Sequence, residues 1–363
     1  MAPLLCALLP LWLAASGFIA SGLATPALAE QPAQVQCAKA LLDVLWTPDE
    51  LAGTDADRVI GPVGEPDASV PVLNPGVSLA PRPAAPPKAL RGAIRRVVPA
   101  RGRKVAAITF DLCERANNVA GYNNRIINLL REHDAKATFF AGGKWLRSHP
   151  EAALQLMADP RFELGNHAWT HGNLGLMTSA EIDSQLRLTE IQHANLRAEL
   201  VRRATAKGLE AEALRVPHVL RLMRLPYGRS SELALNTLAE RGYLVIQWDV
   251  DGEGDEELHS AEVLAKRALA RVRPGSIILL HANAVPQKTY EILQRLLPAL
   301  RARGYELATA GELLRLGPPQ SVRRGYFTIP GDNLKYDAIF PGKGTLKPDP
   351  ARPFTTEPVP PAQ

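Results

Sequence analysis

Short apolar runs and amphipathic segments alternate through the middle of the chain. Apolar runs suited to buried strands lie at 105–110, 137–141, 162–164, 220–223, 243–248, 276–280 and 305–308. Segments with apolar residues at helical spacing lie between them, at 124–132, 150–158, 231–241, 261–272 and 287–303. Thr178 and Glu181 form a capping-box pattern ahead of a further long helix. This alternation predicts an α/β fold with a mostly parallel sheet, either open or closed into a barrel.

The flanks of this centre are predicted to be irregular, because most of the 31 prolines gather there. Proline fixes φ and removes a backbone donor, so dense prolines favour a linker. We therefore expect a Pro-rich and then basic linker over 61–103, a compact domain over 104–315 and a Pro-rich tail over 316–363. Residues 30–60 are predicted to contain a short helical segment, and 326–330 a short strand within the tail.

The first 29 residues predict a secretory signal peptide. Residues 4–20 are mostly apolar, and Ala27-Leu28-Ala29 matches a cleavage signal, although the segment before the apolar run lacks lysine and arginine. The alternative is a retained membrane anchor, which Pro10, Ser16 and Gly17 disfavour because they interrupt the apolar run. We therefore expect an exported protein, periplasmic or secreted, with no stable membrane span after cleavage.

Cleavage of this peptide leaves Cys37 and Cys113. In an oxidising compartment the two residues form a disulfide or remain separate thiols, and the sequence leaves both alternatives open. The net charge of +5 comes partly from a basic run over 91–104 without interleaved aromatic residues. We interpret that run as a solvated linker and expect no nucleic-acid partner.

The candidate chemistry begins with His167 and His171, four residues apart. On a helix this spacing places both imidazoles on one face, where they reach one metal ion. Other candidates follow predicted strands, where α/β folds place active-site loops; these are Asp111, Arg224, Tyr227, Asp251 and His281. Each residue alone has an ordinary explanation, as a helix cap, a turn or a buried polar residue. The hypothesis of an active site therefore rests on the order in which they occur together along the chain.

Together these residues resemble the NodB-like polysaccharide deacetylases, carbohydrate esterase family 4, over about residues 104–312. The matching motifs are Thr109-Phe110-Asp111, the strand at 137–140, His167-x-x-x-His171, Arg224-x-Pro226-Tyr227-Gly228, Asp251 and Leu279-x-His281. The resemblance implies a distorted (β/α) barrel. It also implies a hydrolase of carbon–nitrogen bonds other than peptide bonds, removing N-acetyl groups from a glycan.

The resemblance assigns roles to these residues. A divalent metal ion, with zinc as the first candidate, is expected on His167 and His171. Asp111 is implied as general base and His281 as general acid. The roles of the remaining three residues are supporting ones: Arg224 orients Asp111, the Tyr227 backbone N–H stabilises the oxyanion, and Asp251 pairs with His281 or Arg224.

The chain departs from the family pattern at the third metal ligand, an aspartate directly after the first one. Leu112 stands there and cannot bind metal. We prefer Glu114 as the substitute, with the Cys113 thiolate or a water molecule as alternatives. Two smaller departures are a missing tryptophan over 252–256 and Ala282 where an aspartate is common.

These departures keep other functions open. One is a catalytically weak or inactive barrel that binds envelope polysaccharide, and another is an O-acetyl esterase acting on a carbohydrate. Asp111, Arg224 and His281 favour an enzyme, because a binding protein needs neither a base nor an acid. The expected partner is an acetylated glycan, and chitin-like oligomers, peptidoglycan and exopolysaccharide all remain open.

Overall fold

The computed structural model of the chain describes residues 41–100, 102–284 and 286–340. The predicted signal peptide and Cys37 lie outside these residues. The described residues contain a ten-stranded sheet in the order β10-β1-β6-β5-β4-β3-β2-β8-β7, and β9 pairs with β2. The strands are β1 (Ala93–Val97), β2 (Val105–Leu112), β3 (Ala137–Ala141), β4 (Phe162–Asn166), β5 (Leu222–Met223), β6 (Leu244–Ile246), β7 (Val250–Asp251), β8 (Ile277–His281), β9 (Glu306–Leu307) and β10 (Pro319–Val322).

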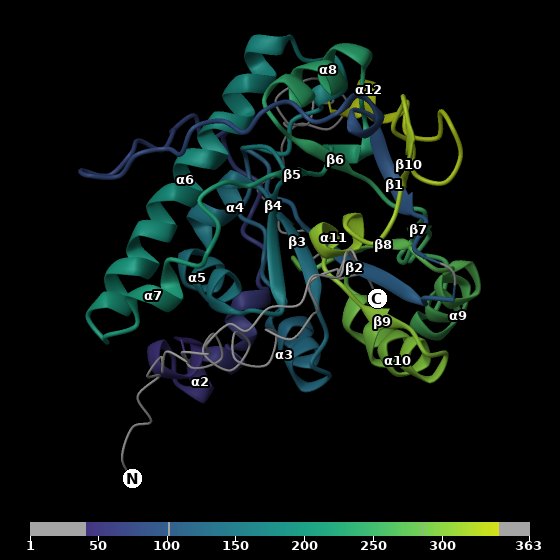
Figure 1. Ribbon diagram of the computed structural model, residues 1–363, viewed down its shortest axis with the longest axis horizontal. Coiled ribbons are helices and arrows are strands. Elements are labelled where there is room, and N and C mark those ends of the chain that lie inside the picture. The colour runs from purple at the N-terminus through teal and green to yellow at the C-terminus, as the bar shows by residue number, and fades with distance from the viewer. Residues whose placement is uncertain (1–40, 101, 285, 341–363) are drawn as a thin grey trace, which may run out of the picture.

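The sheet is parallel throughout except where β1 pairs with β10. It curls into a half-barrel, which confirms the predicted fold class, and helices surround its outside (Figure 1). The helices are α2 (Pro48–Ala52), α3 (Asn124–Glu132), α4 (Gly143–Ser148), α5 (Pro150–Ala158), α6 (Ser179–Thr205), α7 (Glu210–Ala213), α8 (Glu232–Glu240), α9 (Ala261–Arg271), α10 (Thr289–Ala302), α11 (Ala310–Leu314) and α12 (Tyr336–Ile339). No helix within the described ranges has both the length and the apolarity to cross a membrane.

Local sequence signals account for the longest elements. At the start of α6 the Thr178 backbone N–H donates to the Glu181 carboxylate at 2.9 Å, and the Thr178 hydroxyl accepts from the Glu181 backbone N–H at 3.3 Å. This reciprocal pair satisfies backbone donors that the first helical turn leaves free. The predicted bounds of α3, β3 and α5 are confirmed to the residue.

The predicted linker and tail differ from the structure, because both contribute strands to the sheet. Strand β1 lies within 61–103 and pairs with β6 in parallel and with β10, from the tail, antiparallel. The basic composition of β1 misled the prediction: Arg95 is buried and donates to the backbone carbonyls of Tyr326 and Phe327 at 2.6 and 2.7 Å. The folded unit therefore extends beyond the predicted domain over 104–315.

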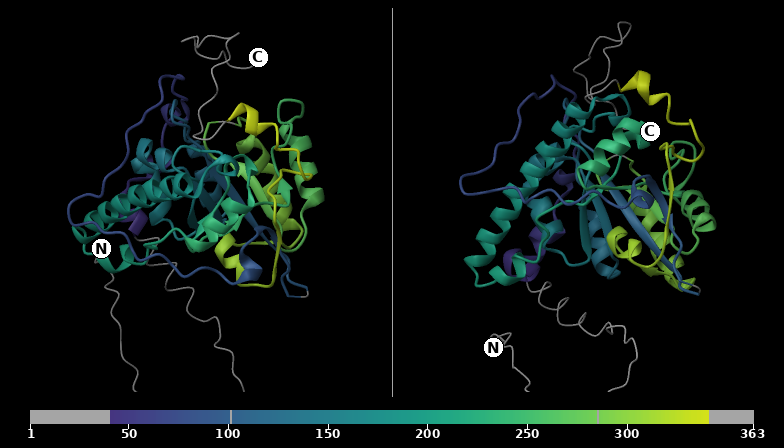
Figure 2. Two further views of the ribbon diagram at one scale, coloured as in Figure 1. Left: turned by 90° about the horizontal axis from the view of Figure 1, so that it is seen from above. Right: turned by 45° about the horizontal axis from the view of Figure 1, so that its top comes forward.

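Residues 326–330 are also not the strand that their apolar side chains suggest. The Asp332 carboxylate accepts from the backbone N–H groups of Phe327, Thr328 and Ile329, which uses up the donors a strand would need. Both views in Figure 2 show the C-terminal segment, in yellow, running along the outside of the molecule to α12.

Toward its carboxyl end, β2 has core residues on one face and polar residues on the other. Ile108, Phe110 and Leu112 belong to the largest hydrophobic cluster, as strand alternation requires of every second residue. Thr109 and Asp111 therefore point to the opposite face. Leu112 is fully buried. The residue that stands in place of the family's aspartate is therefore part of the hydrophobic core.

We expect Leu112→Asp to lower the free energy of unfolding by about 3–5 kcal/mol, because it places a carboxylate in an apolar layer without a partner. Leu112→Met is the matched control and should cost less than about 1.5 kcal/mol, since it keeps the volume and the apolar character. Urea unfolding of the three proteins measures both changes. A Leu112→Asp protein as stable as the wild type would show that position 112 can face the polar side of β2.

Candidate active site

The residues singled out in the sequence meet at the carboxyl edge of the sheet. Asp111 lies near the end of β2 and pairs in register with His281 at the end of β8. The histidine pair follows β4, and Arg224 and Tyr227 follow β5. Parallel strands place their carboxyl ends together, so Asp111, His171, Tyr227 and His281 line one groove of about 730 Å³. His167 and Arg224 are fully buried beside them.

The two histidines meet without a helix, which corrects the helical interpretation of their spacing. His167 and His171 lie in a loop, and Ala168 and His171 have φ values of 65° and 55° in the left-handed region. A side chain accepts hydrogen bonds from the loop backbone instead: Oε1 of the Gln185 side-chain amide accepts from the backbone N–H groups of Trp169 and Thr170. The ring centroids are nevertheless 4.8 Å apart, so the pair converges as predicted.

The tautomer of His167 follows from its partner. Its Nδ1 lies 2.9 Å from the backbone carbonyl of Arg224, which can only accept a hydrogen bond. Nδ1 therefore carries a proton, and Nε2 is directed toward Cys113 Sγ at 3.4 Å and Asp111 Oδ2 at 3.6 Å. Histidines that bind metal are commonly held by such a bond from the second ring nitrogen.

Two overlapping groups of donor atoms surround Cys113. Its sulfur lies within 4.8 Å of nitrogen atoms of His167 and His171, and a second such group joins it to Asp111 and His281. Burial alone would raise the pKa of the Cys113 thiol, but the imidazoles of His171 and His167 lower it well below its ordinary value. A thiolate with two imidazoles is a donor set that fits a divalent ion of the zinc class.

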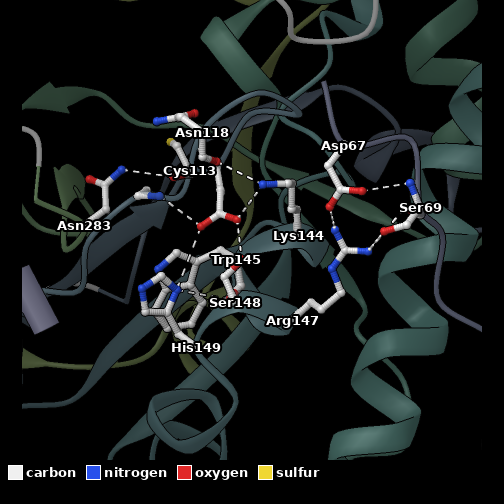
Figure 3. A network of polar contacts seen from close by, with 12 residues as sticks. Asp67, Ser69, Cys113, Asn118, Lys144, Trp145, Arg147, Ser148, His149 and Asn283 are labelled. Carbon is white, nitrogen blue, oxygen red and sulfur yellow. Dashed lines mark hydrogen bonds and ion pairs between the residues drawn. The ribbon is translucent and has the colours of Figure 1, made fainter. Parts of the chain in front are cut away.

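Glu114, the preferred third ligand in the sequence analysis, lies in a separate buried network. Its carboxylate accepts from Lys144 Nζ at 3.1 Å, from the Ser148 hydroxyl at 2.5 Å and from the Ala120 backbone N–H at 3.0 Å. Figure 3 shows this network around Lys144 and Ser148. Because the carboxylate neutralises a buried ammonium, the structure does not bring Glu114 to the histidines, contrary to the prediction.

Arg224 holds Asp111, as the resemblance implied. The guanidinium donates to Asp111 Oδ1 at 3.0 Å, to the Thr109 hydroxyl at 2.9 Å and to the Ile246 carbonyl at 2.9 Å. Both charged groups are buried, and the guanidinium packs over the ring of Phe140 with 4.3 Å to its centroid. Asp111 is thus fixed through one oxygen, while Oδ2 stays on the side of the histidines.

His281 pairs with Glu253, a residue that the sequence analysis missed. Its Nδ1 lies 2.6 Å from Glu253 Oε2, and its backbone N–H donates to Oε1 at 3.1 Å. Burial opposes the charge on His281, yet the Glu253 carboxylate, aided by the neighbouring Cys113, raises the pKa of the imidazole well above its ordinary value.

Asp251 was expected to pair with His281 or Arg224, but in the structure its carboxylate has a different partner. The Asp251 carboxylate accepts from the Glu253 backbone N–H at 3.0 Å and so holds the turn that delivers Glu253. In the sequence, the segment 252–256 differed from the family pattern only by the absence of a tryptophan. Which of its carboxylates reaches His281 depends on the turn after β7, which residue spacing does not reveal.

Tyr227 adopts a left-handed backbone conformation with φ 56°, in the turn Pro226–Gly228. The C-terminal segment holds this turn: Asn333 Nδ2 donates to the carbonyls of Tyr227 at 3.2 Å and Gly228 at 2.8 Å. The Tyr227 ring stacks on Phe340 with centroids 4.3 Å apart. A segment predicted to be a tail therefore forms one wall of the groove.

We expect Glu114→Gln to lower the free energy of unfolding by about 3–5 kcal/mol, because it leaves the Lys144 ammonium buried without a counter-charge. Metal content should not change. Glu132→Gln, on the exposed end of α3, is the control and should stay within about 0.5 kcal/mol of the wild type. Unfolding curves and metal analysis test both statements. Loss of metal at unchanged stability would instead make Glu114 a ligand.

Comparison with known proteins identifies the family of this chain. A family model described as polysaccharide deacetylase matches residues 99–246. Chitooligosaccharide deacetylases of Sinorhizobium fredii and Azorhizobium caulinodans are 28% and 30% identical, over 58% and 50% of this chain and 93% and 83% of their own lengths. A peptidoglycan-N-acetylglucosamine deacetylase of Bacillus cereus is 26% identical over 52% of this chain and 62% of its own. The chain belongs to the polysaccharide deacetylase family.

Proposed function

We propose that this protein is an exported, metal-dependent hydrolase that removes N-acetyl groups from a glycan. The observation that carries the proposal is the convergence of two separately held groups on one metal-type donor cluster. Asp111 is held by Arg224, and His281 is held by Glu253. Both line the groove together with His171, and the buried His167 lies beside Asp111. Export rests on the predicted signal peptide alone.

The metal site would be held by His167 and His171 together with a third donor. When bound, a divalent ion of the zinc class supplies a Lewis acid that polarises the acetyl carbonyl and makes a water molecule more acidic. The chain's own residues then handle the protons. Asp111 accepts the proton of the attacking water at Oδ2, because Oδ1 is occupied by Arg224.

His281 donates a proton from Nε2 to the leaving nitrogen of the sugar. The Glu253 carboxylate accepts the hydrogen on Nδ1, which orients the ring and stabilises its charged form. The Tyr227 backbone N–H, at the groove wall, is the proposed donor to the oxyanion, a contribution worth about 3 kcal/mol in comparable sites. Base and acid lie on adjacent strands, in register with each other.

The candidate glycan substrates come from the similarity to known relatives and not from the shape of the groove. The relatives are deacetylases of chitooligosaccharides and of peptidoglycan, so both classes are candidate substrates, with exopolysaccharide as a third. The second candidate function is glycan binding without turnover, and the observation that favours it is Leu112 in the place of a carboxylate ligand. Release of acetate only from O-acetylated sugars would make the protein an esterase.

We expect the wild type to hold about one divalent ion per chain and to release acetate from at least one of the three glycan classes. Asp111→Asn should reduce turnover by about 100-fold or more while keeping its metal, because the amide cannot accept the water proton. His167→Ala is the companion variant and should lose the metal. Unchanged turnover in Asp111→Asn would show that Asp111 is not the base. If the wild type released no acetate from any acetylated glycan, the glycan-binding function would be the one supported.

We expect Glu253→Gln to lower kcat by about tenfold or more with a smaller effect on KM, because it removes the charge that stabilises the protonated His281. Glu253→Asp should recover part of the loss. Glu257→Gln, exposed in the same loop, is the matched control and should behave as the wild type. Steady-state kinetics on the best glycan measures all three, and a Glu253→Gln protein with normal kcat would contradict the role.

A further inference from the structure

The end of β2 determines which residue can complete the metal site. Asp111 faces the groove, and Leu112 faces the core beside Phe110. Cys113 follows directly after the strand, and its sulfur lies within 4.8 Å of donor atoms of Asp111 and His281, two residues that line the groove. A ligand at position 112 would require a one-residue slip of β2, which would also turn Asp111 away from the groove.

The Cys113 sulfur lies close to nitrogen atoms of both histidines. It lies 3.4 Å from His167 Nε2, and its group with His167 and His171 spans at most 4.8 Å. Donors bound to one tetrahedral zinc ion, at about 2.0–2.3 Å from it, lie roughly 3.3–3.8 Å from one another. The sulfur and both imidazoles therefore need little movement to share one ion.

The backbone on both sides of Cys113 is anchored. Asn283 Nδ2 donates to the Cys113 carbonyl at 3.1 Å, and the Leu112 carbonyl accepts from the Gly142 backbone N–H at 3.0 Å. The following residue, Glu114, is held by the buried Lys144. Because the turn is fixed before any ion binds, the sulfur is preorganised toward the histidines.

We propose that Cys113 is the third protein ligand of the metal, as a thiolate, and that the site therefore takes a zinc-class ion in preference to magnesium or calcium. Thiolate ligands favour zinc and cobalt, whereas magnesium and calcium require oxygen donors. The inference rests on the proposed metal-dependent function. It also means that a loaded site and a Cys37–Cys113 disulfide exclude each other, since the sulfur cannot serve both.

The test is the absorption spectrum of the full chain loaded with Co²⁺. We expect a thiolate-to-cobalt charge-transfer band in the near ultraviolet in the wild type, and its loss in Cys113→Asp, which should still bind cobalt through its carboxylate. Cys37→Ser is the matched control and should keep the band. X-ray absorption of the zinc-loaded wild type should show one sulfur at about 2.3 Å.

The wild-type spectrum decides the question even where a variant fails to fold. Cobalt bound without the charge-transfer band would overturn Cys113 as a ligand and leave the proposed function standing. A band that persists in Cys113→Asp would also overturn it, because another thiol would then be responsible. A wild type that binds no cobalt or zinc, yet still releases acetate after chelation, would overturn the metal-dependent mechanism as well.

Discussion

The buried ion pair between Arg224 and Asp111 is the interaction on which the rest of the site depends. Two charges taken out of water cost several kcal/mol each unless their hydrogen-bonding groups are satisfied. Here the guanidinium reaches an aspartate and a hydroxyl of β2 and a carbonyl of β6, which ties strands across the curled sheet. The backbone carbonyl of the same arginine fixes the tautomer of His167. One residue therefore sets both the proposed base and a metal donor.

The carboxylates of Glu114, Glu253 and Asp251 differ in role because they differ in partner. Glu114 neutralises a buried lysine, Glu253 holds an imidazole, and Asp251 shapes a turn. All three are acidic residues, and composition alone would allow any of them to bind a metal. A carboxylate that neutralises a buried ammonium is not free for a metal, since removing it would leave a buried charge without a partner.

Much of the fold was predictable because its signals are local. The capping box of α6 and the apolar spacing of α3 and α5 depend on neighbouring residues, and those elements form where expected. Strand β1 was not predictable in the same way, because its arginines look solvated until the C-terminal segment supplies backbone acceptors for Arg95. The histidine pair was predicted correctly for the wrong local reason: the loop geometry, and not a helix, brings the rings together.

The order of motifs along the chain was enough to identify the family and to predict that Asp111, His281 and the two histidines come together, because these residues follow strands whose carboxyl ends must meet. The surroundings of Cys113 and Glu114 and the partner of His281 were decided only by the tertiary structure. Whether Leu112, Cys113 or Glu114 faces the groove depends on the strand register and on Lys144, a residue that comes 30 positions later than Glu114. Long-range packing determines which of these side chains faces the groove, so a short stretch of sequence does not predict it.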